Sequence, residues 1–147
     1  MNLLRLHFAP EDEWHGELTA EVSARGFAGR GSAWFAVEEL RQFVAALSAF
    51  PLQAQALPSI TGGVGDRAEA LEQVHLAIAF APHDLRGNVR ATVQLANEVW
   101  NADAADLEAI VKVGFLVTYP DLDQFGSAFD RHLTGENTEA TLRSSVA

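Results

Sequence analysis

The sequence contains no cysteine. Disulfide bonds, thiolate metal sites and a cysteine nucleophile are therefore excluded for this chain. It also contains no run approaching the roughly 18–20 consecutive apolar residues that a membrane-spanning helix needs. The first residues lack the long apolar stretch of a signal peptide, because acidic side chains begin at Glu11. We therefore expect a soluble, cytoplasmic protein that does not associate with membranes.

Basic side chains are scarce. The chain has 10 Lys and Arg residues against 20 Asp and Glu residues, which gives a formal net charge of −10 at pH 7. Nucleic acids and anionic lipids are bound through Lys and Arg, so this charge argues against both as partners. It favours a basic protein as the partner. The alternative interpretation is that the acidic residues only keep the protein dispersed in water.

The length and composition are typical of one folded domain. The chain has 147 residues, of which 48% are hydrophobic, so it can bury a core of its own. We expect a single α+β domain over residues 1–133, with halves at 1–50 and 72–133 and a connector at 51–71. After residue 133 the composition turns polar, which predicts a mobile C-terminal tail over residues 134–147.

Two short sequences occur twice, in the same order. Phe-Ala-Pro-x-Asp stands at residues 8–12 and again at residues 80–84. Leu-x-Gln-Phe follows later in each half, at residues 40–43 and 122–125. Ordered repeats of this kind indicate a duplicated supersecondary unit.

The hydrophobic period predicts the same elements in each half. Alternation with a period of two indicates strands over residues 4–8, 17–25 and 32–37, and again over 74–80, 89–95 and 107–117. A period of three to four then predicts helices over residues 37–50 and 119–133. We interpret the glycines at 26, 29 and 31 and those at 62, 63 and 65 as turns, with room for a short edge strand at 57–61.

These elements lead to one architecture. Strands joined by short turns pair antiparallel, and clean alternation places one face of the sheet on the core. We expect an α+β fold with a mostly antiparallel sheet of six to seven strands. Two helices pack on one face of that sheet, and the whole consists of pseudo-duplicated β-β-β-α units.

No motif for catalysis, a metal ion or a cofactor emerges from the sequence. Ser, His and Asp are present, but the Gly-x-Ser-x-Gly sequence of a hydrolase is not. Neither glycine cluster ends as a phosphate-binding loop does, and the acidic clusters lack the spacing of a calcium loop. We therefore predict no catalytic residues, no metal ligands and no cofactor, and the sequence favours a non-enzymatic role.

The best candidate for a binding site is an acidic turn that carries a tryptophan. Aromatic side chains dominate protein-binding hot spots, and carboxylates favour a cationic partner. The predicted partner-binding residues are Glu11, Asp12, Glu13, Trp14, Glu17 and Glu21. The alternatives are that the carboxylates are merely solvated and that Trp14 folds back over the edge of the sheet.

Several segments also carry a family resemblance. They are Gly-x-Gly-Ser-Ala-Trp-Phe at residues 29–35, the Glu-Leu-x-x-Phe of the next helix, the Tyr119-Pro120 turn and the Leu-x-x-Phe of the last helix. Together they resemble a group of small uncharacterised bacterial proteins, part of which gives immunity to secreted toxins. The resemblance implies an immunity-type protein that neutralises a basic bacterial toxin, and it implies no catalytic residues.

Two other functions are compatible with the sequence. A small-molecule binder or an enzyme would have its site between the two halves, where His7, His75 and Arg90 are predicted to converge. A homodimer would pair the exposed edges of its strands and have only a scaffolding role. The sequence is compatible with both a monomer and a homodimer.

Overall fold

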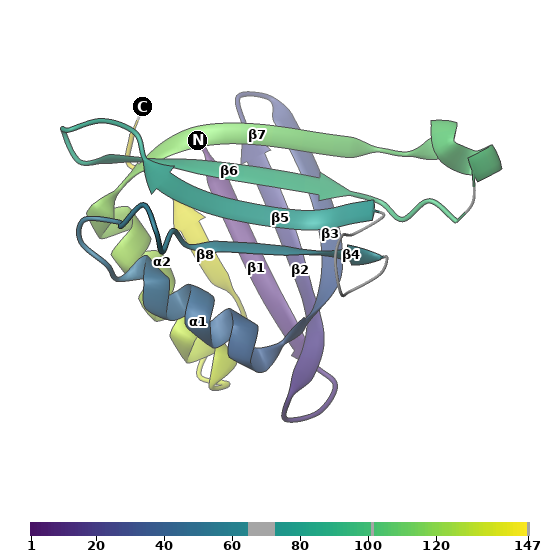
Figure 1. The fold of residues 1–147 in the computed structure, drawn as a ribbon, viewed down its shortest axis with the longest axis horizontal. Helices are drawn as coiled ribbons and strands as arrows, with labels where there is room; N and C mark the ends of the chain where they lie inside the picture. The colour runs from purple at the N-terminus through teal and green to yellow at the C-terminus, as the bar shows by residue number, and fades with distance from the viewer. Residues whose placement is uncertain (65–72, 101, 147) are drawn as a thin grey trace.

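The computed structural model describes residues 1–64, 73–100 and 102–146. Within them the chain forms eight strands, two α-helices and one short 3-10 helix. The predicted α+β class is confirmed. However, the strands form two four-stranded antiparallel sheets instead of one sheet of six or seven strands (Figure 1).

The two halves have the same order of elements. The first half contains β1 (Leu3–Pro10), β2 (His15–Ala24), β3 (Phe27–Ala36), α1 (Val37–Leu47) and β4 (Ser59–Val64). The second half contains β5 (Gln73–Pro82), β6 (Asn88–Ala96), the 3-10 helix η1 (Ala102–Leu107), β7 (Ile110–Thr118), α2 (Tyr119–Leu133) and β8 (Ala140–Arg143). Apart from η1, each half therefore reads β-β-β-α-β.

The strand after each helix joins the sheet of the other half. β4 pairs antiparallel with β5, and β8 pairs antiparallel with β1. The strand orders are β3-β2-β1-β8 in the first sheet and β4-β5-β6-β7 in the second. Buried side chains from both sheets and both helices form one core cluster. This exchange of strands links the two halves through a shared core.

The C-terminal segment differs from the predicted mobile tail. Ala140 and Leu142 of β8 are fully buried. Beyond β8, the Asp121 carboxylate accepts hydrogen bonds from the backbone N–H (3.0 Å) and the hydroxyl (2.9 Å) of Ser145. The prediction failed because β8 is too short for its alternation to be recognised, and its partner β1 lies at the other end of the chain.

β3, the edge strand of the first sheet, crosses all four strands of the second sheet (Figure 1). The predicted turn at residues 29–31 is wrong, because Gly29 and Gly31 lie within β3. A Cβ atom on Gly31 would lie 2.6 Å from the carbonyl oxygen of His75, and one on Gly62 would lie 2.7 Å from the Cβ of Ala33. These glycines therefore allow the two sheets to approach more closely than any side chain would permit.

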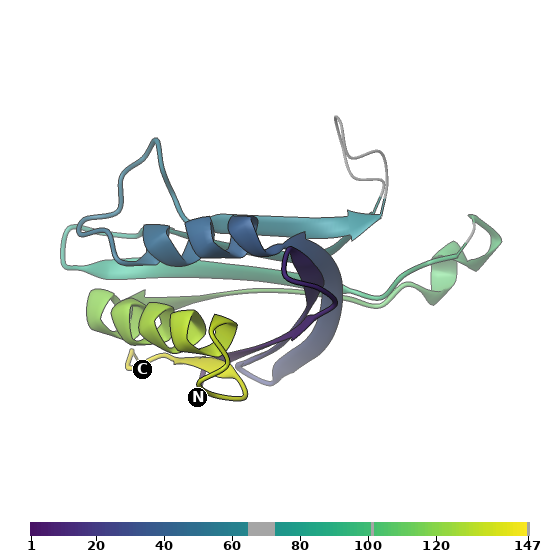
Figure 2. The same cartoon turned by 90° about the horizontal axis from the view of Figure 1, so that it is seen from below.

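α1 and α2 pack against each other (Figure 2). Both predicted helix stripes are buried: Leu40, Phe43 and Leu47 in α1, and Leu122, Phe125 and Phe129 in α2. The ring centroid of Phe43 lies 6.3 Å from that of Phe129 and 6.2 Å from that of Phe80 in β5. α1 ends at Leu47, short of the predicted Phe50, whose ring is 78% exposed.

His132 connects α2 to two other segments. Its side chain is 8% exposed. Nε2 accepts a hydrogen bond of 2.8 Å from the backbone N–H of Phe8, and Nδ1 donates one of 3.0 Å to the carbonyl oxygen of Asn137. These two partners require the tautomer with its hydrogen on Nδ1. The imidazole thus bridges β1 and the loop between α2 and β8.

The close approach of the sheets predicts that Gly31→Ala destabilises the protein. The added methyl group collides with a backbone oxygen, and overpacking of this kind costs about 1–3 kcal/mol. Gly114→Ala is the matched control, because a Cβ there has no neighbour nearer than 3.6 Å. Urea unfolding measures the free energy of unfolding of both variants. Equal unfolding free energies for the two would contradict the close approach.

The burial of β8 predicts that Leu142→Ala lowers the free energy of unfolding by about 2–5 kcal/mol, which is the usual cost of replacing a buried leucine by alanine. Thr141→Ala should change it by less than about 0.5 kcal/mol, because Thr141 lies on the outer face of the same strand. Thermal and urea unfolding provide the comparison. If a chain ending at residue 133 were as stable as the parent, β8 would not belong to the fold.

Candidate protein-binding site

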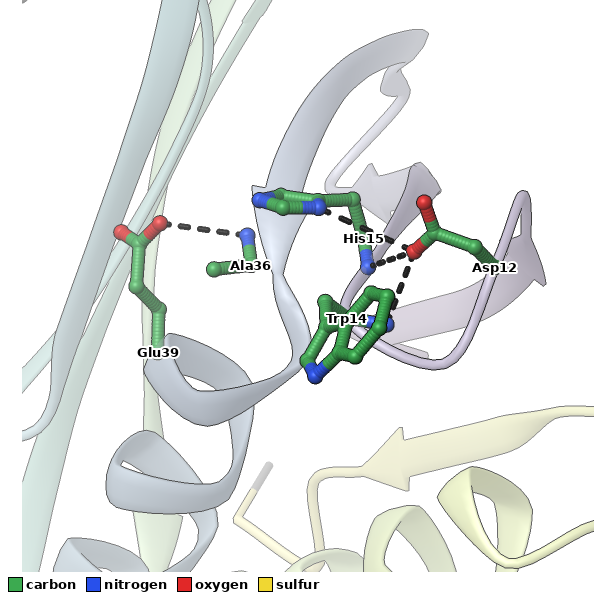
Figure 3. Close-up of polar contacts among 5 residues, drawn as sticks. All are labelled: Asp12, Trp14, His15, Ala36 and Glu39. Atoms are coloured by element: carbon green, nitrogen blue, oxygen red, sulfur yellow. Dashed lines mark hydrogen bonds and ion pairs between the residues drawn. The ribbon is translucent and has the colours of Figure 1, made fainter.

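The acidic turn, residues 11–14 between β1 and β2, is organised by Asp12. Its Oδ1 accepts hydrogen bonds of 2.8 Å from the backbone N–H groups of both Trp14 and His15 (Figure 3). Between β5 and β6, Asp84 accepts from the backbone N–H groups of Arg86 (2.8 Å) and Asn88 (3.2 Å) in the same manner. In both halves, the aspartate of the repeated Phe-Ala-Pro-x-Asp sequence therefore stabilises a turn by accepting hydrogen bonds from backbone N–H groups that follow it.

Trp14 is an exposed side chain on a fixed backbone. Its N–H donates to Asp12, and its carbonyl oxygen accepts a hydrogen bond of 2.7 Å from the N–H of Val37, the first residue of α1. The indole is nevertheless 64% exposed, and it lies between the acidic turn and the start of α1 (Figure 3). Because the backbone of Trp14 is already fixed, binding of a partner to the indole does not have to order it. The entropic cost of binding is therefore lower.

Further carboxylates come from α1. Glu38 and Glu39 stand in the first turn of this helix and are exposed. The Glu39 carboxylate accepts a hydrogen bond of 3.2 Å from the backbone N–H of Ala36 (Figure 3). The bond between Val37 and Trp14 brings this end of α1 to the acidic turn. Reasoning from the sequence missed Glu38 and Glu39, because the pairing of His15 with Ala36 and this long-range bond place them there.

The carboxylate of Asp12 is held in its ionised form. Hydrogen bonds from the backbone N–H groups of Trp14 and then His15 lower the pKa of Asp12 below its ordinary value of 3.8. The Nδ1 atom of His15 also lies 3.7 Å from Oδ1 of Asp12. The exposed Glu11 and Glu13 complete the acidic turn around this fixed charge.

The other two predicted residues occupy different places on the outer face of the first sheet. Glu17 is half-buried in β2, opposite Trp34 of β3, whose side chain is 55% exposed. Glu21 lies about 13 Å farther along β2 at 3.3 Å per residue. Its Oε2 is 3.8 Å from Nη1 of Arg5. Glu17 is thus near the acidic turn, whereas Glu21 stands apart beside a cation.

The predicted convergence of His7, His75 and Arg90 is wrong. His7 lies on β1 and bonds to the carbonyl oxygen of Thr138 at 2.9 Å. His75 is buried near one end of β5. Arg90 pairs with Ala81, six positions along β5 from His75, which corresponds to about 20 Å. The two strands therefore hold His75 and Arg90 at opposite ends.

Other kinds of site are not evident in the described part of the chain. No group of three or more His, Cys, Asp or Glu side chains in it is arranged to hold a metal ion. Among the same residues, no helix has the length and apolarity needed to cross a membrane. A shallow depression of about 390 Å³ lies beside Arg25, Arg90 and Leu116. The guanidinium of Arg25 already donates a hydrogen bond of 2.6 Å to the carbonyl oxygen of Gly114 there.

A second surface lies on the connection between β6 and β7. This connection, of which the structure describes residues 97–100 and 102–109, is called the arm here, and it projects from the body of the molecule (Figures 1 and 2). Trp100 is 82% exposed and Leu107 is 71% exposed. An exposed tryptophan on this connection was not predicted from the sequence. The length of the connection was the available signal, because a hairpin turn needs few residues.

No family model matches this chain, and no curated protein or solved structure matches it either. We therefore infer the function from the geometry of the acidic turn, the arm and their surroundings. Both surfaces combine an exposed tryptophan with carboxylates, which is the combination expected of a contact with a cationic protein.

The hydrogen bonds to Asp12 and Asp84 predict that both carboxyls titrate below pH 3.8 in the folded protein. A lowered folded-state pKa stabilises the fold above the unfolded pKa, and this contribution is lost as the pH falls through the folded value. Carboxyl-detected NMR titration measures both midpoints. Midpoints at or above 3.8 would contradict the turn geometry.

Proposed function

We propose that this chain is a non-enzymatic protein-binding module whose acidic turn contacts a basic protein. Trp14 carries the proposal, since its indole is 64% exposed while both of its backbone groups are hydrogen-bonded. An aromatic anchor bordered by charged groups is the usual composition of a binding hot spot and its rim. Glu11, Asp12 and Glu13 supply the charge, and Glu17 extends it onto the sheet.

The charge of the whole chain supports the same kind of partner. A net charge of −10 attracts a cationic protein over distances of about a Debye length, roughly 10 Å at 0.1 M salt. Local carboxylates then determine where the partner docks, because complementary charges fix orientation and raise the association rate. The complementary surface is an apolar depression bordered by Lys or Arg side chains.

A basic bacterial toxin is the specific partner that the sequence resemblance suggests. In this proposal the protein acts in the cytoplasm as an immunity-type protein and masks a cationic surface of the toxin. The resemblance at residues 29–35 and in the two helices supports this choice, together with the acidic character of the chain.

We also propose that the two halves derive from one duplicated unit. The repeated Phe-Ala-Pro-x-Asp sequences end β1 and β5, and Asp12 and Asp84 then form similar turns. The Leu and Phe of each repeated Leu-x-Gln-Phe sequence lie on the buried face of α1 or α2. The order β-β-β-α-β in both halves extends the proposed unit by one strand.

We propose that the protein is a monomer, because side chains already occupy part of the edge of the second sheet at β7. β7 is an edge strand of the second sheet. Arg25 donates a hydrogen bond to the carbonyl oxygen of Gly114, and the hydroxyl of Ser144 donates one to that of Leu116. Covered edges of this kind oppose pairing with a second chain.

The first functional test neutralises the acidic turn with Glu11→Gln, Asp12→Asn and Glu13→Gln. The asparagine retains an oxygen that can accept the two backbone hydrogen bonds, so the turn is expected to persist. The binding partner is first identified in the source cells with a photo-reactive p-benzoylphenylalanine at position 13, and is then purified. We expect the dissociation constant, measured by calorimetry at low salt, to rise by about tenfold or more.

The matched control is Asp123→Asn, Asp130→Asn and Glu136→Gln, which removes three exposed carboxylates from elsewhere on the surface. A far smaller effect of this control separates a local contact from the effect of net charge. The difference between the two variants should shrink at high salt. Unchanged affinity for the partner after neutralisation of the acidic turn would contradict the proposal.

A further inference from the structure

The arm is much longer than the corresponding connection in the first half. In the first half, β2 and β3 are joined by Arg25 and Gly26 alone, because Ala24 pairs with Phe27. In the second half, the corresponding strands β6 and β7 stop pairing at Ala96 and Ile110, and the arm lies between them. Long connections in compact domains are usually functional when they are ordered.

The base of the arm is fixed by side chains. Gln73 of β5 donates from Nε2 to the carbonyl oxygen of Val99 (2.7 Å) and accepts at Oε1 from its N–H (3.0 Å). The buried His75 donates from Nε2 to the same Oε1 at 3.0 Å. Asn97 closes the hairpin by donating from Nδ2 to the carbonyl oxygen of Leu107 (3.2 Å). The base of the arm is thus held to the second sheet by side-chain hydrogen bonds as well as by its chain connections to β6 and β7.

Beyond this base, the arm exposes apolar side chains. Trp100 and Leu107 are 82% and 71% exposed, and Ile110 at the start of β7 is 57% exposed. None of these three side chains belongs to the core cluster. Exposed apolar groups gathered on one projecting connection, unlike singly exposed ones, often mark a contact with another molecule.

The charge of the arm selects the partner. Residues 97–109 contain four carboxylates, those of Glu98, Asp103, Asp106 and Glu108, and no Lys or Arg. All four are exposed. Such a surface repels acidic proteins, nucleic acids and anionic membranes, and it is complementary to a protein with Lys and Arg at its surface.

We propose that the arm is a second contact element, with Trp100 seated in an apolar pocket bordered by Lys or Arg on a basic protein. This inference rests on the proposed function, in which the acidic turn contacts the same basic protein. Two separate contacts on one partner increase affinity and fix its orientation, provided that both engage together.

The test uses the basic protein that is cross-linked through position 13, so the partner is selected without reference to the arm. Its dissociation constant is measured by calorimetry for Trp100→Ala and for Asp103→Asn, Asp106→Asn and Glu108→Gln. Trp100→Ala should weaken binding by about tenfold or more, as loss of a hot-spot aromatic does. The charge variant should weaken it at low salt and much less at high salt.

Leu85→Ala is the control, because this leucine is fully exposed in the turn between β5 and β6. It should leave affinity within about twofold of the parent. A further variant replaces residues 97–109 by Asn-Gly, the two-residue hairpin turn. Circular dichroism shows whether that variant folds. If it does not fold, the test relies on the single substitution Trp100→Ala.

The outcomes separate the two proposals. If Trp100→Ala and the arm charge variant bind as tightly as the parent while the acidic-turn variant does not, the arm proposal is overturned and the proposed function stands. If position 13 cross-links no basic protein, or only an acidic one, both proposals are overturned. Weakening by both the turn and the arm variants, with Leu85→Ala unaffected, supports both.

Discussion

Where β3 crosses the second sheet, backbone lies directly against backbone. A single Cβ atom on Gly31 would come within 2.6 Å of the carbonyl oxygen of His75, and one on Gly62 would meet Ala33 at 2.7 Å. The two sheets can approach this closely only because these positions lack side chains. This approach brings both sheets and both helices onto one core. Within that core, Phe43 of α1 packs on Phe80 of β5.

The strands of the two sheets position the candidate surfaces. β3 ends at Ala36, and α1 begins at the next residue, so the start of α1 meets the acidic turn through the bond between Val37 and Trp14. The arm leaves the second sheet beside Val99, whose backbone is bound by Gln73. Rigid strands thus carry two exposed tryptophans on connections that the core does not use, which is the usual arrangement of binding loops on a scaffold.

Local patterns predicted the parts of the structure that depend on local physics. The buried faces of both helices and the turns at Asp12 and Asp84 follow from side-chain period and from hydrogen bonds between near neighbours. The division into two sheets, the pairing of β8 with β1 and the role of Gly31 depend on residues far apart in the chain. Pattern alone cannot distinguish a glycine that forms a turn from one that admits a neighbouring strand. Of the site, Trp14 and its carboxylates were predicted, whereas Glu38, Glu39 and Trp100 depend on tertiary placement.

The crossing of β3 over the second sheet can be observed directly by NMR. Nuclear Overhauser effects from the Hα protons of Gly31 report which side chains lie against this backbone. We predict cross-peaks to Leu95 of β6, since a Cβ on Gly31 would lie 3.1 Å from the Cβ of Leu95. Cross-peaks from Gly31 only to β2, with none to β5 or β6, would contradict the crossing.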